Sequence, residues 1–321
     1  MAEIKCQEWT LKELAKGLYV FFGPTNVGVA AQKKSSGVTE IYFIDAGEDE
    51  GAAKKLYGAC QNLFGEISVK AVICTHAHAD HIGGAAWLKE KTLCEIWASQ
   101  AEKSCAETPQ IQAQSFYGAF PLPELDAPYF HAPQCFVDRV IFGGQQIKCG
   151  GFDFEFLSLP GHSYGMLGIL AAASGGKKVF YAGDGIFGRS MLRRFWTPFV
   201  VDVKSFKESI EKISKIQADF FVPSHGDVYD EVDELAELNL ISTISNEKLI
   251  EEILAQPKTH EELLKAFADK SDITLRLSQF MLIGSSLRSY LTCLYKEGRV
   301  RWFFEKNKMY WQTVGGTADK A

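Results

Sequence analysis

Three histidines and one aspartate fall within six positions of this sequence. His76, His78, Asp80 and His81 come directly after the short apolar run Ala71–Cys74, which is typical of a buried strand. Imidazole nitrogens and carboxylate oxygens are the ligands that zinc and similar ions take in catalytic sites. A polar loop that only capped a helix would need one Asp or Ser and not three histidines. The segment therefore predicts a metal site directly after the strand.

Four further polar residues stand just past other predicted strands. They are Asp45 after Ile41–Ile44, His162 after Phe154–Leu159, Asp184 after Lys178–Tyr181, and His225 after Phe220–Val222. Taken singly, each would be an ordinary loop histidine or turn aspartate. Proteins of the α/β class usually place their reactive groups at the C-terminal ends of strands. The shared placement therefore favours one site that several strands assemble together.

These residues resemble the five ordered motifs of the metallo-β-lactamase superfamily. The motifs are Asp45, the H-x-H-x-D-H run at 76–81, His162, Asp184 and His225, all in the family's order and without a substitution. The resemblance implies the α/β fold of that family, an αββα sandwich of two mixed sheets flanked by helices. We expect this catalytic domain to occupy residues 1–242.

The same resemblance implies two half-sites that hold two divalent metal ions. His76, His78 and His162 would hold one ion, Asp80, His81 and His225 would hold the other, and Asp184 would bridge them. Asp45 is similar to the family's outer carboxylate, which fixes the orientation of the ligand loop. Zinc is the expected metal, although iron or manganese also fits these ligand types. A Glu in place of His78 would indicate the di-iron flavoprotein branch, which this chain therefore disfavours.

A carboxylate-bridged metal pair lowers the pKa of a shared water, so that hydroxide forms at neutral pH. Asp80 is expected to pass a proton to the leaving group. Residues 183–189 resemble the corresponding stretch of glyoxalase II-like hydrolases, so we expect hydrolysis of a small-molecule ester, thioester or lactone. Three other hypotheses stay open: a metal-dependent endoribonuclease, an iron-dependent thiol or persulfide oxidoreductase, and a non-catalytic nucleic-acid-binding module.

Three helical patterns and a hairpin follow residue 242. They are Asn246–Ala255, Thr259–Ala268, Thr274–Glu297, and the strand pair Arg299–Phe304 and Met309–Thr313. This order resembles a winged-helix domain, which we place at residues 243–321. The second helix begins with a Thr259-x-x-Glu262 capping box, and His260 in its first turn is expected to be solvated.

Prolines and aromatic residues crowd the segment Ser104–Asp138. Proline at this density argues against regular elements. A long irregular segment in a compact domain is often a lid or a binding loop, although its aromatic rings could equally pin it to the core. The aromatic residues expected to line a pocket are Phe116, Tyr117, Phe120, Tyr129 and Phe130.

Charge is distributed unevenly along the chain. Residues 1–242 contain 22 Lys and Arg against 30 Asp and Glu, whereas residues 243–321 contain 12 against 10. Non-specific binding of nucleic acid depends on basic surfaces. The balance favours a small-molecule substrate, and a nucleic-acid partner is left open but not favoured.

The N-terminal 17 residues do not resemble a signal peptide, and no run approaches the ~18 apolar residues of a membrane span. We therefore expect no membrane partner and a cytoplasmic location. The eight cysteines form no C-x-x-C pair, which argues against a disulfide framework. The sequence does not determine whether the chain forms a homo-oligomer.

Overall fold

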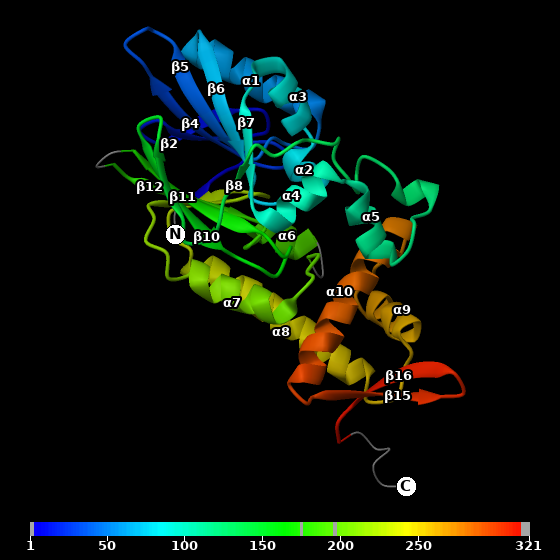
Figure 1. Cartoon of the computed structure of the whole chain (residues 1–321). Helices are drawn as coiled ribbons and strands as arrows, with labels where there is room; N and C mark the ends of the chain where they lie inside the picture. Colours follow the sequence, from blue (N-terminus) through cyan, green and yellow to red (C-terminus); the bar gives the residue numbers. More distant parts are fainter. Residues whose placement is uncertain (1–2, 174–175, 195–197, 316–321) are drawn as a thin grey trace.

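Two seven-stranded mixed sheets lie face to face, and helices cover their outer sides (Figure 1). The computed structural model describes residues 3–173, 176–194 and 198–315. A core of side chains from both sheets fills the space between them, and two further cores lie under the outer helices. This architecture is the α/β sandwich that the sequence predicts.

The first sheet has the strand order β2-β3-β4-β5-β6-β7-β8. Its strands are β2 Leu11–Ala15, β3 Leu18–Phe21, β4 Val27–Lys33, β5 Thr39–Ile44, β6 Ile67–Ile73, β7 Glu95–Ala98 and β8 Arg139–Val140. Strands β2 to β5 pair antiparallel, and β5 to β8 pair parallel. Along β5, Ile41 and Phe43 face the outer helices, whereas Tyr42 and Ile44 face the second sheet. Burial of both faces explains why residues 41–44 of this strand form an unbroken apolar run.

The second sheet has the order β1-β14-β13-β12-β11-β10-β9. Its strands are β1 Glu3–Ile4, β9 Gln146–Cys149, β10 Phe152–Ser158, β11 Leu167–Ala173, β12 Lys178–Gly183, β13 Phe220–Pro223 and β14 Val228–Tyr229. Only the β12–β13 pair is parallel within this described sheet. Phe152, Phe154 and Phe156 alternate along β10 with more polar residues and fill the core between the sheets. This period of two is the pattern of a strand with one buried face.

The outer helices are amphipathic and bury one face each. Helices α1 (Glu50–Phe64) and α3 (Ala85–Thr92) cover the first sheet, and α7 (Val203–Ile213) covers the second. In α7, Phe206, Ile210 and Ile213 lie on one face, as their spacing predicts, and pack in the same core as the β12 and β13 side chains. A short helix, α6 (Arg189–Arg194), follows β12.

The proline-rich segment is more regular than the sequence suggested. Helix α4 (Gln100–Glu107) extends into it, and α5 (Gln110–Tyr117) lies within it. Our expectation of an irregular chain from residue 104 was therefore wrong up to residue 117. Pro109 occupies the N-cap of α5, where the missing N–H of proline costs no helical hydrogen bond. Beyond α5, the chain contains the short 3₁₀ turn η1 (Pro123–Leu125).

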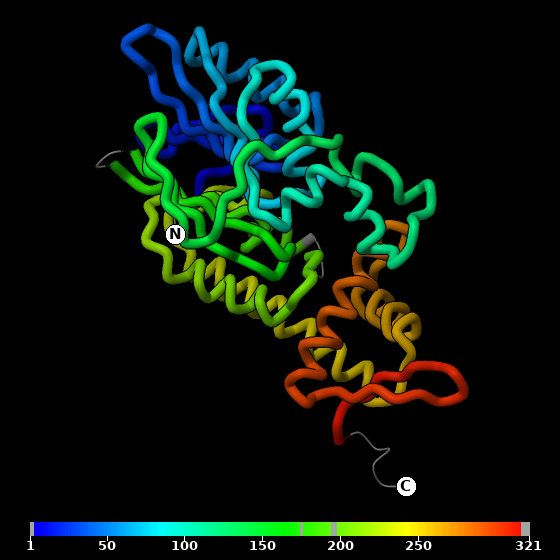
Figure 2. The backbone as a smooth tube through the Cα atoms, viewed as in Figure 1, coloured from blue at the N-terminus to red at the C-terminus, as the bar shows by residue number. Residues whose placement is uncertain are grey.

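Three helices and a hairpin end the described chain, as the sequence predicts. They are α8 Asp233–Ile253, α9 His260–Lys270, α10 Leu277–Lys296, β15 Val300–Glu305 and β16 Lys308–Thr313. Helix α8 begins earlier than expected and runs unbroken through residues 242 and 243, so the expected boundary lies inside a helix and not in a linker. The backbone in Figure 2 passes directly from under the second sheet into the C-terminal helices. The assignment as a winged helix stays a prediction.

One continuous apolar core explains the absence of a linker there. Phe206 of α7, Leu264 of α9 and Leu287 of α10 belong to the same buried cluster. His260 also joins two of these helices, because its Nε2 donates to the carbonyl oxygen of Gly284 over 2.8 Å. Our expectation that His260 is solvated was therefore wrong, since the side chain is half-buried against α10.

All eight cysteines have free thiols, and most of them are buried among apolar side chains. Within the residues that the structure describes, no helix has the length and apolar character that crossing a membrane requires.

Candidate metal centre

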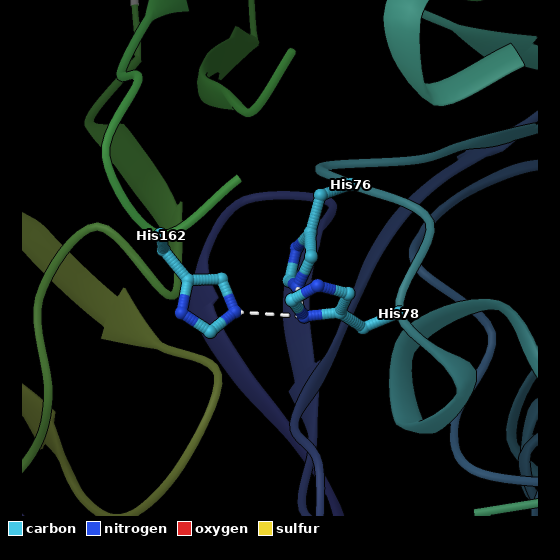
Figure 3. A group of neighbouring side chains, drawn as sticks. All are labelled: His76, His78 and His162. Atoms are coloured by element: carbon cyan, nitrogen blue, oxygen red, sulfur yellow. Dashed lines mark hydrogen bonds between the residues drawn. The ribbon is translucent and has the colours of Figure 1, made fainter. Parts of the chain in front are cut away.

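The candidate ligands meet at one edge of the sandwich, where several strands end. His76 and His78 follow β6, Asp80 and His81 lie on the short helix α2 (Ala79–Ile82), and His162, Asp184 and His225 follow β10, β12 and β13. The structure therefore brings together all the residues that the sequence analysis predicts as metal ligands. Figure 3 shows the rings of His76, His78 and His162 turned toward one another from the two sheets.

The first half-site consists of these three imidazoles. His78 Nδ1 lies 3.0 Å from His76 Nε2 and 2.8 Å from His162 Nε2 (Figure 3). Burial and the neighbouring imidazoles lower the pKa of His76 well below its usual range and lower that of His78 to about 3. Burial lowers the pKa of His162 as well. The three rings are therefore neutral at pH 7, which is the form that binds a metal ion.

The second half-site combines two imidazoles with a carboxylate. His225 Nε2 lies 3.3 Å from Asp80 Oδ2, and His81 Nε2 lies 3.6 Å from the same oxygen. Burial favours neutral imidazole here, but Asp184 and Asp80 outweigh it and raise the pKa of His225 to about 9. Burial likewise opposes the charge on Asp80, yet His81 and His225 hold its pKa below the usual range.

Asp184 reaches both half-sites. Its Oδ2 lies 3.3 Å from His162 Nε2, and its Oδ1 lies 3.5 Å from His81 Nε2 and 3.6 Å from His225 Nε2. A carboxylate with one oxygen toward each set of imidazoles has the geometry of a bridge.

The outer nitrogens of three imidazoles are held by hydrogen bonds that fix each ring. His162 Nδ1 donates to Phe199 O over 2.7 Å, and His225 Nδ1 donates to Pro24 O over 2.8 Å. His81 Nδ1 lies 2.9 Å from Asp45 Oδ2. Donation from Nδ1 leaves the lone pair of Nε2 directed toward the centre, which is the usual outer arrangement around metal-binding histidines.

Asp45 connects two parts of the site. Its carboxylate accepts from the Thr75 backbone N–H at 2.7 Å and the Thr75 hydroxyl at 2.8 Å, besides its contact with His81. The residue has φ 66°, in the left-handed region that Asp tolerates better than most residues. This conformation turns the carboxylate back over the end of β6, so Asp45 acts as a positioning residue and does not face the centre.

The donor set fits divalent cations. His81 Nε2 and Asp184 Oδ1 are buried, and neither has a hydrogen-bond partner among the described residues. Buried polar atoms are normally satisfied, so two converging acceptors of this kind call for an ion. Three groups of ligand atoms lie within 4.8 Å of one another: His76, His78 and His162; His76, His81 and Asp184; and Asp80, His81 and His225.

Glu102, which the sequence analysis did not identify, connects the loop that carries His76 and His78 to the loop that carries His162. Glu102 on α4 accepts from the backbone N–H of Ala77 at 2.8 Å, the hydroxyl of Ser163 at 2.8 Å and the backbone N–H of Gly165 at 2.9 Å. Gln112 on α5 donates from Nε2 to the carbonyl oxygen of Ala77. The backbone N–H and the carbonyl oxygen of Ala77, which lies between His76 and His78, thus both form hydrogen bonds with side chains. The only sequence signal was Ser99-x-x-Glu102, which looks like an ordinary capping box.

A cavity of about 640 Å³ opens beside His78. Its apolar wall includes Phe116 and Phe199, whose rings contact each other at a centroid distance of 5.0 Å. Phe116 is the one member of the expected aromatic group that lines this cavity. The side chains of Tyr117, Phe120 and Tyr129 are exposed, and Phe130 packs in a small separate cluster.

A model of the metallo-beta-lactamase superfamily matches residues 23–225, a span that contains every candidate ligand. The chain belongs to this superfamily. Membership implies binding of divalent metal, and the histidine and aspartate groups described above are compatible with it. The match ends before α8, so it does not test the C-terminal helices.

Two curated relatives are hydroxyacylglutathione hydrolases. The chain is 36% identical over 146 residues to hydroxyacylglutathione hydrolase GloC of Haemophilus influenzae, which covers 45% of this chain and 60% of that protein. It is 28% identical over 151 residues to the hydroxyacylglutathione hydrolase of Bdellovibrio bacteriovorus, which covers 47% and 46%. The chain thus spans about half the length of these relatives.

Solved structures share the fold over a longer span. A beta-lactamase domain protein from Burkholderia ambifaria aligns with a TM-score of 0.73 at 16% identity and covers 97% of both chains. A metallo-beta-lactamase family protein from Thermus thermophilus aligns with a TM-score of 0.72 at 19% identity and covers 93% of this chain and 99% of that one. At such identities the likeness concerns the fold alone.

Proposed function

We propose that this protein is a metal-dependent hydrolase that cleaves a small-molecule thioester, ester or lactone, with a thioester as the first choice. The observation that carries this proposal is the cavity beside His78, because its volume of about 640 Å³ lies in the range of small-molecule sites. Residues 1–242 would form the catalytic part, and residues 243–321 would contribute the far wall of the cavity through α10.

The proposed roles follow from the two half-sites. His76, His78 and His162 would hold one ion, Asp80, His81 and His225 a second, and Asp184 would bridge them, with zinc preferred for this mixture of nitrogen and oxygen donors. Bound divalent ions lower the pKa of water and stabilise the negative charge that develops on an attacked carbonyl oxygen.

The chain's own groups would orient the reactants and move the proton. The rings of Phe116 and Phe199 give the cavity an apolar wall that limits water next to His78. The Asp80 side chain is 45% exposed, more than the other carboxylate of the centre, so it can reach a leaving group. Asp80 would therefore give the leaving thiolate or alkoxide its proton.

The names of the two curated relatives support a thioester as substrate, because a hydroxyacylglutathione is a thioester. The alignments cover only 60% and 46% of the two relatives. The identity of the thiol is therefore a separate question.

The test is hydrolysis of three matched classes, a hydroxyacylglutathione, a simple carbon ester and a lactone, by zinc-loaded protein. We expect turnover of the thioester that a chelator stops and added zinc restores. Asp184→Ala should abolish it with an unchanged circular dichroism spectrum, whereas Asp153→Ala, which removes an exposed carboxylate on β10, should leave it unchanged. No turnover of any of the three classes by the zinc-loaded protein would reject the proposal.

A further inference from the structure

The cavity beside His78 has two chemically different ends. At one end lie His78 and Ser163, next to the metal centre. At the other end, helix α10 contributes Ser285, Arg288, Ser289 and Thr292. Their spacing of three and four residues puts these four side chains on one face of the helix. Helix α10 also contacts α5 and α7, so this face is held against the catalytic part (Figure 1).

Arg288 is a cation without a partner of its own. Its side chain is exposed, and among the described residues its guanidinium has no carboxylate within ion-pair distance. Arg299 behaves differently, because Glu247 and Glu251 accept from its guanidinium at 2.7 and 2.6 Å. A free guanidinium in a concave site presents parallel N–H donors that match a carboxylate or a phosphate.

Two hydroxyls beside Arg288 are available to the same ligand. Ser289 Oγ accepts from the backbone N–H of Val203 at 3.0 Å, which leaves its own hydroxyl proton free to donate. Ser285 forms no hydrogen bond through its side chain within the described chain. Thr292 differs, since its hydroxyl already donates to Arg288 O over 2.9 Å.

Negative charge is found at the opposite end. Among the described residues that line the cavity, Glu102 is the acidic one, and it lies next to the ligand loops. Its carboxylate already accepts hydrogen bonds from these loops, so it is not a partner of Arg288. The net charge of the chain is −6, so attraction of an anion must come from this local cation and not from the overall field.

We propose that this cavity selects substrates that carry an anionic group, a carboxylate or a phosphate, remote from the bond that is cleaved, and that Arg288 with Ser285 and Ser289 binds this group. The inference rests on the proposed hydrolase function and narrows its substrate class. Arg288 is thereby a specificity-determining residue on the C-terminal helices, in a part of the chain where the family model does not extend.

The experiment compares thioesters that differ only in charge. One pair of N-acetylcysteamine thioesters ends in a carboxylate or in the isosteric amide on the acyl side, and a second pair places the same difference on the thiol side. A phosphonate-ended analogue of the same length distinguishes phosphate from carboxylate recognition. We expect the wild type to prefer one charged member by about tenfold in kcat/KM, the effect of one charge-assisted pair at a solvent-accessible site.

The variants assign this preference to one side chain. Arg288→Gln should bring the ratio of kcat/KM between the charged and the neutral member of each pair to about one. Arg288→Lys should keep part of the preference, because lysine retains the charge but not the paired N–H donors of the guanidinium. Lys248→Gln removes the same charge from an exposed position on α8 and should change nothing. A wild type with no preference for any charged member, or a preference that survives Arg288→Gln, would overturn the inference.

A binding measurement separates this inference from the proposed function. Glutarate is titrated into zinc-loaded wild type and Arg288→Gln, and the wild type should bind it at least about fivefold more tightly. That result would support the anion site even if no thioester were cleaved, whereas equal affinities would overturn it even if thioesters were cleaved well.

Discussion

The histidines of the two half-sites differ in their protonation. Burial among other imidazoles keeps His76 and His78 neutral, so the first half-site presents its lone pairs without a cation. In the second half-site, Asp184 and Asp80 offset the effect of burial and keep His225 protonated up to a pH of about 9. In the proposed two-ion centre, a divalent ion would therefore enter the first half-site without competition from protons and would displace protons from the second.

Zinc binding at the second half-site should accordingly release protons. His225 is protonated at pH 7 in the metal-free protein, because its pKa is raised to about 9, so zinc affinity should rise as the pH increases from 7. Calorimetric titration in buffers of different ionisation enthalpy measures the proton release directly. Uptake of the second zinc without proton release at pH 7 would contradict this assignment.

Glu102 holds the first half-site together although it touches no candidate ligand side chain. Glu102→Ala leaves the N–H groups of Ala77 and Gly165 and the hydroxyl of Ser163 without their acceptor. We expect zinc affinity of the first half-site to fall about 10- to 100-fold, the usual effect of removing outer support around a metal site. Competition with a fluorescent zinc chelator measures this affinity without relying on turnover.

A neighbouring carboxylate is the matched control for that measurement. Glu107 lies on the same helix and accepts from the backbone N–H of Val137 at 3.0 Å, but it does not contact the ligand loops. Glu107→Ala should leave zinc affinity unchanged. If both variants lost zinc affinity equally, Glu102 would act only through the general stability of the protein, and its specific support of the first half-site would be rejected.

At the scale of elements, the sequence predicted the parts of the site that follow from strand position. His76, His162 and His225 each stand directly after an apolar run, and parallel pairing of β5 with β6 and of β12 with β13 brings such ends to one edge. Local composition could not predict Glu102 or Gln112, because their partners are backbone groups far away in sequence.

The start of helix α8 could not be predicted for a similar reason. A change of pattern near residue 242 marks where the fold family's sandwich ends, but periodicity does not reveal that α8 continues through that point. Helix α5 was missed because proline was taken as a breaker, whereas Pro109 precedes the helix and does not interrupt it. Both errors concern how elements connect, which depends on tertiary packing more than on local propensity.

The shared core predicts that the C-terminal helices unfold together with the sandwich. Leu287 of α10 is fully buried in the cluster that contains Phe206 and Phe180, so Leu287→Ala should lower the free energy of unfolding by about 2–5 kcal/mol. Leu277 lies on the same helix but is 37% exposed, and Leu277→Ala should cost less than about 1 kcal/mol.

Chemical denaturation followed by two probes checks this coupling. Trp302 and Trp311 lie in the C-terminal hairpin, so both are first replaced by phenylalanine. In that background, tryptophan fluorescence reports mainly on the sandwich through Trp9, Trp87 and Trp97, and circular dichroism reports on all helices. We expect one transition that Leu287→Ala shifts equally in both signals. A transition seen by circular dichroism alone, with unchanged fluorescence, would show that the C-terminal helices form an independent unit.

At the scale of the whole molecule, charge argues against a polyanionic substrate. The sequence up to residue 242 carries 22 Lys and Arg against 30 Asp and Glu. In the C-terminal part, Arg299 is engaged by Glu247 and Glu251 and has little left for phosphate. Binding of RNA needs many neutralised phosphates, and each one adds a salt-dependent contribution to affinity. A small substrate with one anionic group needs only a single local cation.

We therefore predict that single-stranded RNA is a poor substrate and a poor competitor. Zinc-loaded protein is given a thioester in the presence of increasing single-stranded RNA, first at low and then at physiological salt. We expect thioester turnover to be almost unaffected by RNA at physiological salt, because the excess of acidic residues up to residue 242 repels the phosphate backbone. Cleavage of the RNA is followed in the same reactions by gel electrophoresis, with a chelator as control. Efficient, chelator-sensitive RNA cleavage that weakens steeply as salt is added would instead favour the endoribonuclease hypothesis, since such a slope counts the phosphates that the protein neutralises.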